Sequence, residues 1–95
     1  MRLVAAELLH EFKRKHPDSK TALEAWETAV RGHHFRHFVD LKETFRAADY
    51  VKPYTVFNIS GNRYRLISVV NYRLGVISIE SVLTHADYDQ GKWRH

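Results

Sequence analysis

Hydrophobic residues in the first half of the chain recur three or four positions apart, which is the spacing of one face of an α-helix. This spacing predicts a helix over residues 6–16, because the proline that follows disfavours helical backbone in the residue before it. A second helix is predicted next, with Asp18 or Ser19 as its N-cap and Gly32 as its stop. A shorter helical stretch is predicted over residues 38–45.

The second half of the chain alternates between apolar and polar residues, which is typical of β-strands. A β-rich stretch over residues 54–59 leads into Ser60-Gly61-Asn62, a turn signal of β-hairpins, and an alternating stretch follows over 64–72. A third strand is predicted over 76–83, and a short apolar strand over 1–5 precedes the helices. Helices first and strands second predict an α+β fold with helices packed on one face of a small sheet.

The length and composition limit what this fold can do. The chain has 95 residues, so we expect residues 1–95 to form one domain. It has no cysteine, which excludes disulfides, thiolate catalysis and cysteine-based zinc sites. No apolar run approaches the roughly 18–20 residues that span a membrane, and the start lacks the features of a signal peptide. We therefore expect a soluble cytoplasmic protein without a membrane partner.

The chain is basic, with a formal net charge of +4 and a pI near 9.6. Both halves of the sequence carry this excess, so there is no separate basic tail. A basic balance suits an anionic partner such as RNA. Ordinary solubility charge explains the same composition, so charge alone does not decide between the two interpretations.

Two arginines in the second predicted hairpin strand are candidates for binding phosphate. Arg63 and Arg65 are two residues apart, so on a strand their side chains leave the same face about 6.5–7 Å apart. A guanidinium donates hydrogen bonds in pairs and keeps its charge near neutral pH, which suits phosphate. The alternatives are a solvated strand face or an ion pair with Glu80 on the next strand.

The segment Thr84-His85-Ala86-Asp87-Tyr88-Asp89 places an imidazole, a phenol and two carboxylates within six residues. An imidazole exchanges protons at cellular pH, and a tyrosine can stack on a base or orient a phosphate. The structural alternative is that Thr84 and Asp87 make turn hydrogen bonds while Tyr88 closes the edge of the core.

A histidine-rich stretch over residues 33–37 raises the possibility of a metal site. His33 and His37 are four residues apart and would share one face of a helix. No glutamate lies between them and no third ligand is identifiable, so we predict no metal site here. We expect Phe35 to be buried, with the imidazoles and Arg36 on a basic surface.

Three stretches resemble the HigB-type toxins of bacterial type II toxin–antitoxin modules, in the RelE superfamily. They are HEFKRKHPD (10–18), VFNISGNRYRLI (56–67) and VLTHADYDQGKW (82–93), and the resemblance extends over essentially the full length. It implies a RelE-like α+β fold with a small, mostly antiparallel sheet. It also implies an endoribonuclease that cleaves mRNA on the translating ribosome without metal or cofactor and so inhibits translation and growth. The implied partners are mRNA, the ribosome and a cognate HigA-like helix-turn-helix antitoxin, in a possible toxin–antitoxin hetero-oligomer.

For the cleavage reaction that the resemblance implies, we assign roles to residues within the matching motifs from their chemistry. Arg65, helped by Arg63, would bind the scissile phosphate and stabilise the charge that develops on it. His85 is the candidate for proton transfer. Tyr88 would stack on or orient the RNA, and Asp89 would contact the RNA or orient His85 or a base.

Further residues are candidates for this site. Glu80 is a further candidate for the general base, although it stands where related sequences often carry arginine. We expect Arg73 and Lys92 to contact RNA, and the sequence does not decide which residue is base and which is acid. Two alternatives remain open. One is a basic RNA- or ribosome-binding module with weak or no cleavage activity, and the other is a structural partner that functions only in its antitoxin complex.

Overall fold

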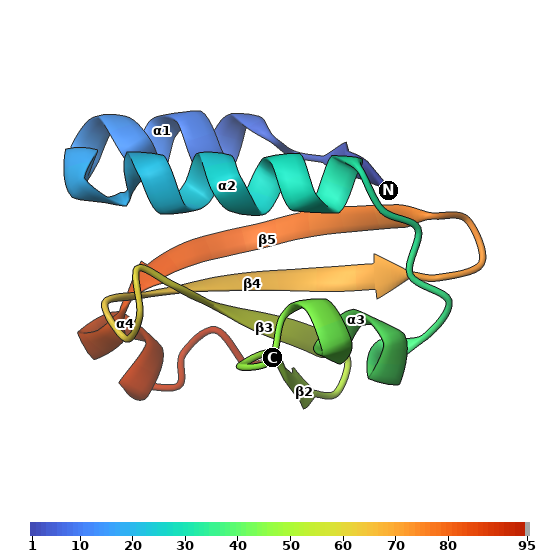
Figure 1. Cartoon of the computed structure of the whole chain (residues 1–95). Helices are drawn as coiled ribbons and strands as arrows, with labels where there is room; N and C mark the ends of the chain where they lie inside the picture. The colour runs from blue at the N-terminus through green and yellow to red at the C-terminus, as the bar shows by residue number, and fades with distance from the viewer. Residues whose placement is uncertain (95) are drawn as a thin grey trace.

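The computed structural model describes residues 1–94 as one five-stranded sheet with helices layered against it (Figure 1). The elements in chain order are β1 (Arg2–Val4), α1 (Glu7–Lys15), a 3₁₀ turn (Pro17–Ser19), α2 (Lys20–Arg31), α3 (Phe38–Thr44), β2 (Asp49–Val51), β3 (Tyr54–Ile59), β4 (Tyr64–Asn71), β5 (Val76–Thr84) and α4 (His85–Asp89). The strand order is β1-β5-β4-β3-β2. Only β1 and β5 run parallel, so the predicted α+β fold with a mostly antiparallel sheet is confirmed.

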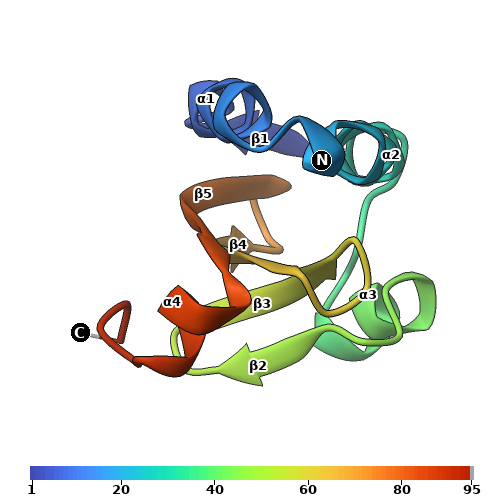
Figure 2. The same cartoon turned by 90° about the vertical axis from the view of Figure 1, so that its left-hand side faces the viewer.

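Helices α1 and α2 cover one face of the sheet, whereas α4 and the C-terminal segment lie on the other side (Figure 2). Leu23, Trp26 and Val30 of α2 are buried in the core between helices and sheet, as their helical spacing predicts. From the sheet, Phe57 and Leu66 enter the same core. None of the helices within residues 1–94 has the length and apolar character needed to cross a membrane.

The predicted N-cap of the second helix is only partly correct. Ser19 occupies the N-cap position, but its hydroxyl donates to the His16 carbonyl at 2.7 Å and makes no capping hydrogen bond. The Asp18 carboxylate accepts hydrogen bonds from Arg63 and from the Tyr64 hydroxyl, each at 2.7 Å. Asp18 therefore ties the start of the helical layer to the β3–β4 hairpin instead of capping α2.

The predicted hairpin turn joins β3 and β4 over residues 60–63. Ser60 and Gly61 have φ values of 53° and 65°, the left-handed region that a tight turn requires. The Arg63 N–H donates to the Ser60 carbonyl at 3.3 Å and closes the loop. This hairpin brings Asn62 and Arg63 to the end of the sheet where α4 begins, because the His85 N–H donates to the Arg63 carbonyl at 2.9 Å.

A β-bulge interrupts the pairing of β4 with β5. Ile67 pairs with Ser81 and Ser68 with Ile79, so Glu80 is the extra residue with no partner on β4. A bulge reverses which residues face each side, since side chains alternate along a strand.

The reversal explains how the end of β5 contributes to both sides of the sheet. Ile77 and Ile79 are buried in the helix-side core before the bulge, whereas after it Val82 packs on that side. Leu83 packs against the small apolar cluster on the opposite side, which consists of Val56, Ile67 and Trp93.

The sequence pattern missed two short elements. Strand β2 has three residues at the edge of the sheet, too few for alternation to be visible. Helix α4 has five residues and no apolar stripe, and it starts because the Thr84 hydroxyl oxygen accepts a hydrogen bond from the Asp87 N–H at 3.2 Å. Beyond α4 the chain turns back and buries Trp93 on the open side of the sheet.

Candidate RNA-processing site

Arg65 lies on β4 with only 8% of its surface exposed. Its Nη1 donates to the carbonyl oxygens of Asn62 and Tyr64, at 3.2 and 3.1 Å. Its Nη2 donates to the side-chain oxygen of Asn62 at 3.1 Å. All three acceptors are neutral and belong to the hairpin turn or the first residue of β4, so the turn itself fixes the position of the guanidinium.

Within residues 1–94, no carboxylate lies within ion-pair distance of Arg65. A mostly buried cation without a counter-ion is costly, because taking a charge out of water is repaid only by a close opposite charge or by good hydrogen bonds. Neutral acceptors hold this guanidinium but leave its positive charge intact. The site is therefore prepared to bind an anion.

The His85 ring and the Asp89 carboxylate are in contact on one face of α4. The His85 Nδ1 lies 2.9 Å from Asp89 Oδ2, the two residues being four apart, and both side chains are about half exposed. A carboxylate bonded to Nδ1 fixes the orientation of the ring and leaves Nε2 to face substrate. The proposed role of Asp89 in orienting His85 is consistent with this geometry.

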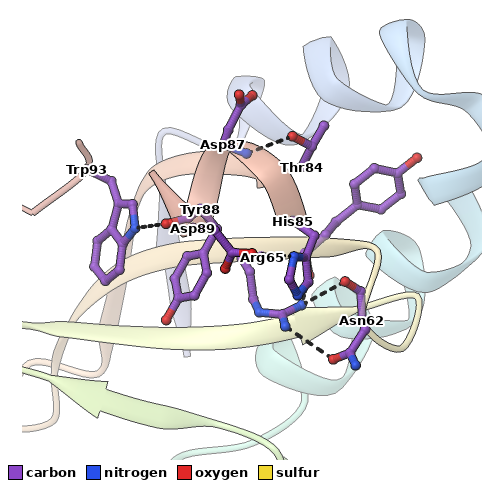
Figure 3. Close-up of polar contacts among 9 residues, drawn as sticks. Asn62, Arg65, Thr84, His85, Asp87, Tyr88, Asp89 and Trp93 are labelled. Carbon is purple, nitrogen blue, oxygen red and sulfur yellow. Dashed lines mark hydrogen bonds and ion pairs between the residues drawn. The ribbon is translucent and has the colours of Figure 1, made fainter. Parts of the chain in front are cut away.

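The Tyr88 ring lies between Trp93, on which it stacks, and the guanidinium of Arg65 (Figure 3). Its ring stacks on Trp93 with centroids 4.9 Å apart and planes 13° apart, and the Trp93 Nε1–H donates to the Tyr88 carbonyl at 2.9 Å. The Arg65 guanidinium carbon lies 5.4 Å from the Tyr88 ring centroid. Tyr88 therefore both closes the edge of the small apolar cluster and borders the site. Because its ring is already engaged, the hydroxyl is the part left to orient RNA.

The four predicted site residues Arg65, His85, Tyr88 and Asp89 lie together where β4, the hairpin turn and α4 meet (Figure 3). The cluster combines a buried cation, an oriented imidazole and a phenol. A cation stabilises a phosphate that gains negative charge during a reaction, and an imidazole can give or take a proton at that phosphate. The arrangement has the groups required for phosphodiester cleavage by proton transfer.

The prediction that Arg63 and Arg65 leave the same face of a strand is wrong. Arg63 precedes β4 and belongs to the turn, and its guanidinium lies 2.7 Å from Asp18 at the helical layer. Tyr64, which bonds the same carboxylate, packs in the helix-side core. Strand alternation does not extend into the turn, so the two arginines point to different places and Arg63 does not complete a clamp with Arg65. The alternative pairing of these arginines with Glu80 is also not formed.

The structure does not bring Glu80 to the cluster. Glu80 is exposed at the β-bulge and borders a hollow on the α1 side of β5, together with Leu8, Phe12 and Lys15 of α1. Arg65 and His85 are reached from the other side of the sheet. A role for Glu80 as the base acting at Arg65 therefore has no support in this geometry.

The two remaining candidates lie outside the cluster. Arg73 is exposed in the β4–β5 turn, at the opposite end of β4 from Arg65. Lys92 is exposed in the C-terminal segment, next to the buried Trp93. Lys92 is thus placed to contact RNA near the site, and Arg73 only to contact RNA that extends along the molecule.

The histidine-rich segment is a loop between α2 and α3, so the predicted shared helix face of His33 and His37 is wrong. The His33 Nδ1 bonds the Ala29 carbonyl at 2.7 Å, and the His37 Nδ1 accepts from the Asp40 N–H at 3.2 Å. Phe35 is buried and Arg36 is exposed, as predicted. No group of three potential ligands that could hold a metal ion occurs within residues 1–94.

Sequence reasoning overlooked two residues that shape the site, Asn62 and Trp93. Asn62 supplies two of the three acceptors of Arg65, and Trp93 supplies the surface on which Tyr88 stacks. Asn62 lies in the motif NRYR and Trp93 in the motif HADYDQGKW, each close in sequence to the residue that it supports. An asparagine in a turn next to a functional arginine is the only signal that could have pointed to the first.

The fold and the cluster together define a small basic α+β protein with a phosphate-directed site on the open side of its sheet. The family model of HigB_toxin, the RelE-like toxic component of a toxin–antitoxin system, matches residues 19–91. This match covers most of the chain and includes every residue of the cluster, so the protein belongs to the HigB toxin family.

Similar curated proteins support this assignment over nearly the whole length. The chain is 30% identical over 92 residues to the mRNA interferase toxin HigB of Escherichia coli strain K12, a match that covers 94% of this chain and 88% of the relative. The proteins named mRNA interferase HigB from Escherichia coli O157:H7 and Shigella flexneri match with the same identity and coverage.

Proposed function

We propose that this protein is the toxin of a type II toxin–antitoxin module and that it is an endoribonuclease that cleaves mRNA on the translating ribosome. The observation that carries the proposal is the buried, unneutralised Arg65 beside the His85–Asp89 pair. Membership of the HigB toxin family supports the toxin class, and the names of its relatives support mRNA as the substrate.

The reaction that suits these groups is an internal transesterification of RNA. The ribose 2′-oxygen bonds to the adjacent phosphorus, and the bond from phosphorus to the 5′-oxygen of the next nucleotide breaks. The proton of the 2′-hydroxyl passes to a base, and the departing 5′-oxygen receives a proton. The products are a 2′,3′-cyclic phosphate and a 5′-hydroxyl end, and the reaction needs neither water nor a metal ion.

The residues of the cluster divide this work between them. Arg65 binds a non-bridging phosphate oxygen and stabilises the pentacoordinate phosphorus, where charge develops. His85, oriented by Asp89, carries a proton to or from the reacting oxygens. The Tyr88 hydroxyl orients the phosphate or the base beside it, and Lys92 contacts a flanking phosphate.

The partners follow from the same proposal. The site is open on one side of the sheet, and a ribosome would hold mRNA extended against it in the cytoplasm. A cognate helix-turn-helix antitoxin neutralises the toxin in a hetero-oligomer. Because such a partner binds the folded toxin, the complex should melt at a higher temperature than the toxin alone.

The proposal is tested by adding the purified protein to a translation reaction and mapping the ends of the mRNA. We expect new 5′-hydroxyl and 2′,3′-cyclic phosphate ends with the wild type and not with Arg65→Ala. Free mRNA without ribosomes serves as the comparison for ribosome dependence. A phosphorothioate at the cut site tests for metal, because rescue by thiophilic Cd²⁺ would indicate a metal ion bound to that oxygen and would contradict metal-free cleavage.

The two alternatives predict different results, one in this translation reaction and the other when the protein is expressed alone in cells. A binding module without cleavage activity would slow translation but leave the mRNA intact. A structural partner that acts only within its antitoxin complex would cause no growth defect when expressed alone. Either result would overturn the proposed endoribonuclease.

A further inference from the structure

We propose that Asn62 is a positioning residue that holds Arg65 by one edge so that the other edge is free to bind the scissile phosphate. This inference rests on the proposed function, because it concerns the residue that would bind the RNA phosphate. It is carried by which guanidinium atoms of Arg65 are bonded and which are not.

A guanidinium can bind a partner through two different edges. The end edge consists of Nη1 and Nη2, and the side edge consists of Nε and Nη2. In this protein Nη1 and Nη2 both donate to Asn62, to its main-chain and side-chain oxygens at 3.2 and 3.1 Å. Asn62 thus accepts from both nitrogens of the end edge, and the Tyr64 carbonyl accepts a further bond from Nη1 at 3.1 Å.

Within residues 1–94, the Nε of Arg65 makes no hydrogen bond, and its Nη2 makes only the bond to the Asn62 side chain. An Nε–H and one Nη2–H therefore remain as a parallel pair of donors, which is the geometry that binds two oxygens of one phosphate. Tyr88 lies over the guanidinium and limits its rotation, with its ring centroid 5.4 Å from the guanidinium carbon. Together Asn62 and Tyr88 leave one productive orientation of Arg65.

The amide of Asn62 matters because it is neutral. An aspartate at this position would make the same contact as an ion pair and would neutralise the charge that phosphate is to meet. An alanine would remove only the acceptor of Nη2, while the main-chain carbonyls of residues 62 and 64 still accept from Nη1, so the guanidinium would be held at one nitrogen and could turn about it. The two substitutions separate the charge of Arg65 from its orientation.

Asn62 can be replaced without disturbing the core, because it is exposed in the turn and is not among the residues with positive φ. A matched control exists at the other end of β4. The Asn71 side chain accepts a hydrogen bond from the Leu74 N–H at 3.0 Å in the β4–β5 turn. Asn71→Asp changes the net charge by the same amount as Asn62→Asp, but it lies far from Arg65.

The first experiment measures single-turnover cleavage of mRNA on ribosomes, normalised to folded protein. We expect Asn62→Ala to lose about 10- to 100-fold in rate, because a small misplacement of a catalytic group has effects of this size. We expect Asn62→Asp to lose on the order of 100-fold or more, because it removes the charge stabilisation as well. Asn71→Asp should stay within about threefold of the wild type.

The second experiment measures binding of a 2′-O-methyl oligonucleotide, which cannot be cleaved, as a function of salt. Each phosphate contact to a single strand contributes about 0.7 to the slope of log affinity against log salt. We expect Asn62→Asp to lose about one contact and Asn62→Ala to keep the wild-type slope. Adding Arg65→Ala to Asn62→Asp should cause little further loss, because both changes remove one interaction.

Several results would overturn the assignment. Cleavage by Asn62→Asp at the wild-type rate would do so, and so would equal losses in Asn62→Asp and Asn71→Asp. An unchanged salt slope in Asn62→Asp would show that the residue shapes only the turn. The binding experiment does not depend on cleavage, so a wild type that binds RNA but never cuts it would refute the proposed function and still leave the role of Asn62 tested.

Discussion

The core between the sheet and its helices contains thirteen buried hydrophobic residues, whereas the cluster on the opposite side contains three, Val56, Ile67 and Trp93. The two sides also differ in what polar groups they hold. The mostly buried Arg65 lies on the side of the smaller cluster (the thin side), where its hydrogen-bond partners are neutral and its Nε makes no hydrogen bond within residues 1–94.

This difference teaches how so small a protein keeps a site open. A 95-residue chain buries a modest core, and here the helices concentrate that core on one side of the sheet. The other side can then carry a charged, exposed cluster without being needed for most of the folding free energy. Mutations on the two sides should therefore separate stability from activity.

The sharpest test of this division compares two neighbours on β4. Leu66 and Ile67 have almost no exposed surface, but Leu66 faces the helices and Ile67 faces the thin cluster. We expect Leu66→Ala to cost near the upper end, and Ile67→Ala near the lower end, of about 2–5 kcal/mol of unfolding free energy. The cost depends on how well the surroundings collapse, and the neighbours of Ile67 in its cluster are mostly partly buried, whereas Leu66 lies among twelve other buried residues of the helix-side core.

Urea denaturation of both variants measures this difference. The slope of free energy against urea concentration must stay the same in both for the two values to be compared. If Ile67→Ala destabilises the protein as much as Leu66→Ala, the thin side carries as much of the fold as the helical side and the division is wrong.

The second test concerns activity without stability. Arg65→Ala should reduce cleavage by about 10²–10³-fold, as the loss of one group that stabilises developing charge does. Its unfolding free energy should change by only about 1 kcal/mol, since the bonds that it loses are to neutral acceptors. Arg65→Lys should recover part of the rate, because an ammonium keeps the charge but not the paired donors.

Rates at saturating substrate and melting curves of the same preparations decide this prediction. A well-folded Arg65→Ala protein with full toxicity would remove Arg65 from the site. A protein that fails to fold would instead show that the thin side also holds the structure together.

Much of the fold could be predicted because its elements have strong periodic patterns. The strand over residues 54–59 was predicted with the correct bounds, since β-rich residues fill it and a turn signal ends it. The helix ending at residue 15 lies within the predicted range because a proline follows closely. Helix α4 was missed, because its five residues are fixed by the Thr84 cap and by contacts of Tyr88 and His85 that no periodicity reveals.

The site was predicted in its residues but not fully in its geometry. Arg65, His85, Tyr88 and Asp89 were named from motifs and lie together. The prediction that Arg63 and Arg65 share one strand face is wrong, because Arg63 lies in the turn, where the alternation of a strand does not apply. The support of Arg65 by a neutral turn residue likewise depends on the geometry of the hairpin. A pattern of apolar and polar positions along the sequence does not reveal such contacts.

A smaller loss of rate is expected when proton transfer is disturbed on the thin side. His85→Gln keeps much of the size and hydrogen bonding of the residue but cannot carry a proton, so cleavage should fall on the order of 100-fold. Between pH 5.5 and 8 the rate should depend less on pH in the variant than in the wild type, because glutamine cannot exchange a proton. Asp89→Asn, which weakens the contact at 2.9 Å, should lose less than His85→Gln.

Single-turnover rates on programmed ribosomes, normalised to folded protein, provide the measurement. If His85 only braces the C-terminal turn, the variant will melt at a lower temperature and its folded fraction will cleave normally. If His85→Gln cleaves at near-wild-type rates across that pH range, Tyr88 or Asp89 carries the proton and His85 does not.

The smallest change in stability is expected for substitution of Asp18, which lies where the helical layer meets the β3–β4 hairpin. The hydrogen bond from the Tyr64 hydroxyl, followed by that from the Arg63 guanidinium, holds the pKa of Asp18 below its usual value. A carboxyl group with a lowered pKa in the folded state stabilises the protein above the unfolded pKa of about 3.9. That stabilisation is lost as the pH falls through the folded pKa.

We therefore expect the wild type to melt slightly above Asp18→Asn at neutral pH, with the difference shrinking as the pH falls from about 4 through the lowered pKa of Asp18 in the folded state. Tyr64→Phe should remove part of the same pH dependence, because it deletes the first of the two hydrogen bonds to Asp18 while keeping the ring in the core. Both variants should cleave RNA at nearly the wild-type rate, because Asp18 holds Arg63 and not Arg65. Melting temperatures from pH 7 to 2.5, combined with cleavage rates at pH 7, test both parts. A large loss of cleavage in Asp18→Asn would show that the Asp18–Arg63 contact transmits to the site, and the two sides of the sheet would then not be separable.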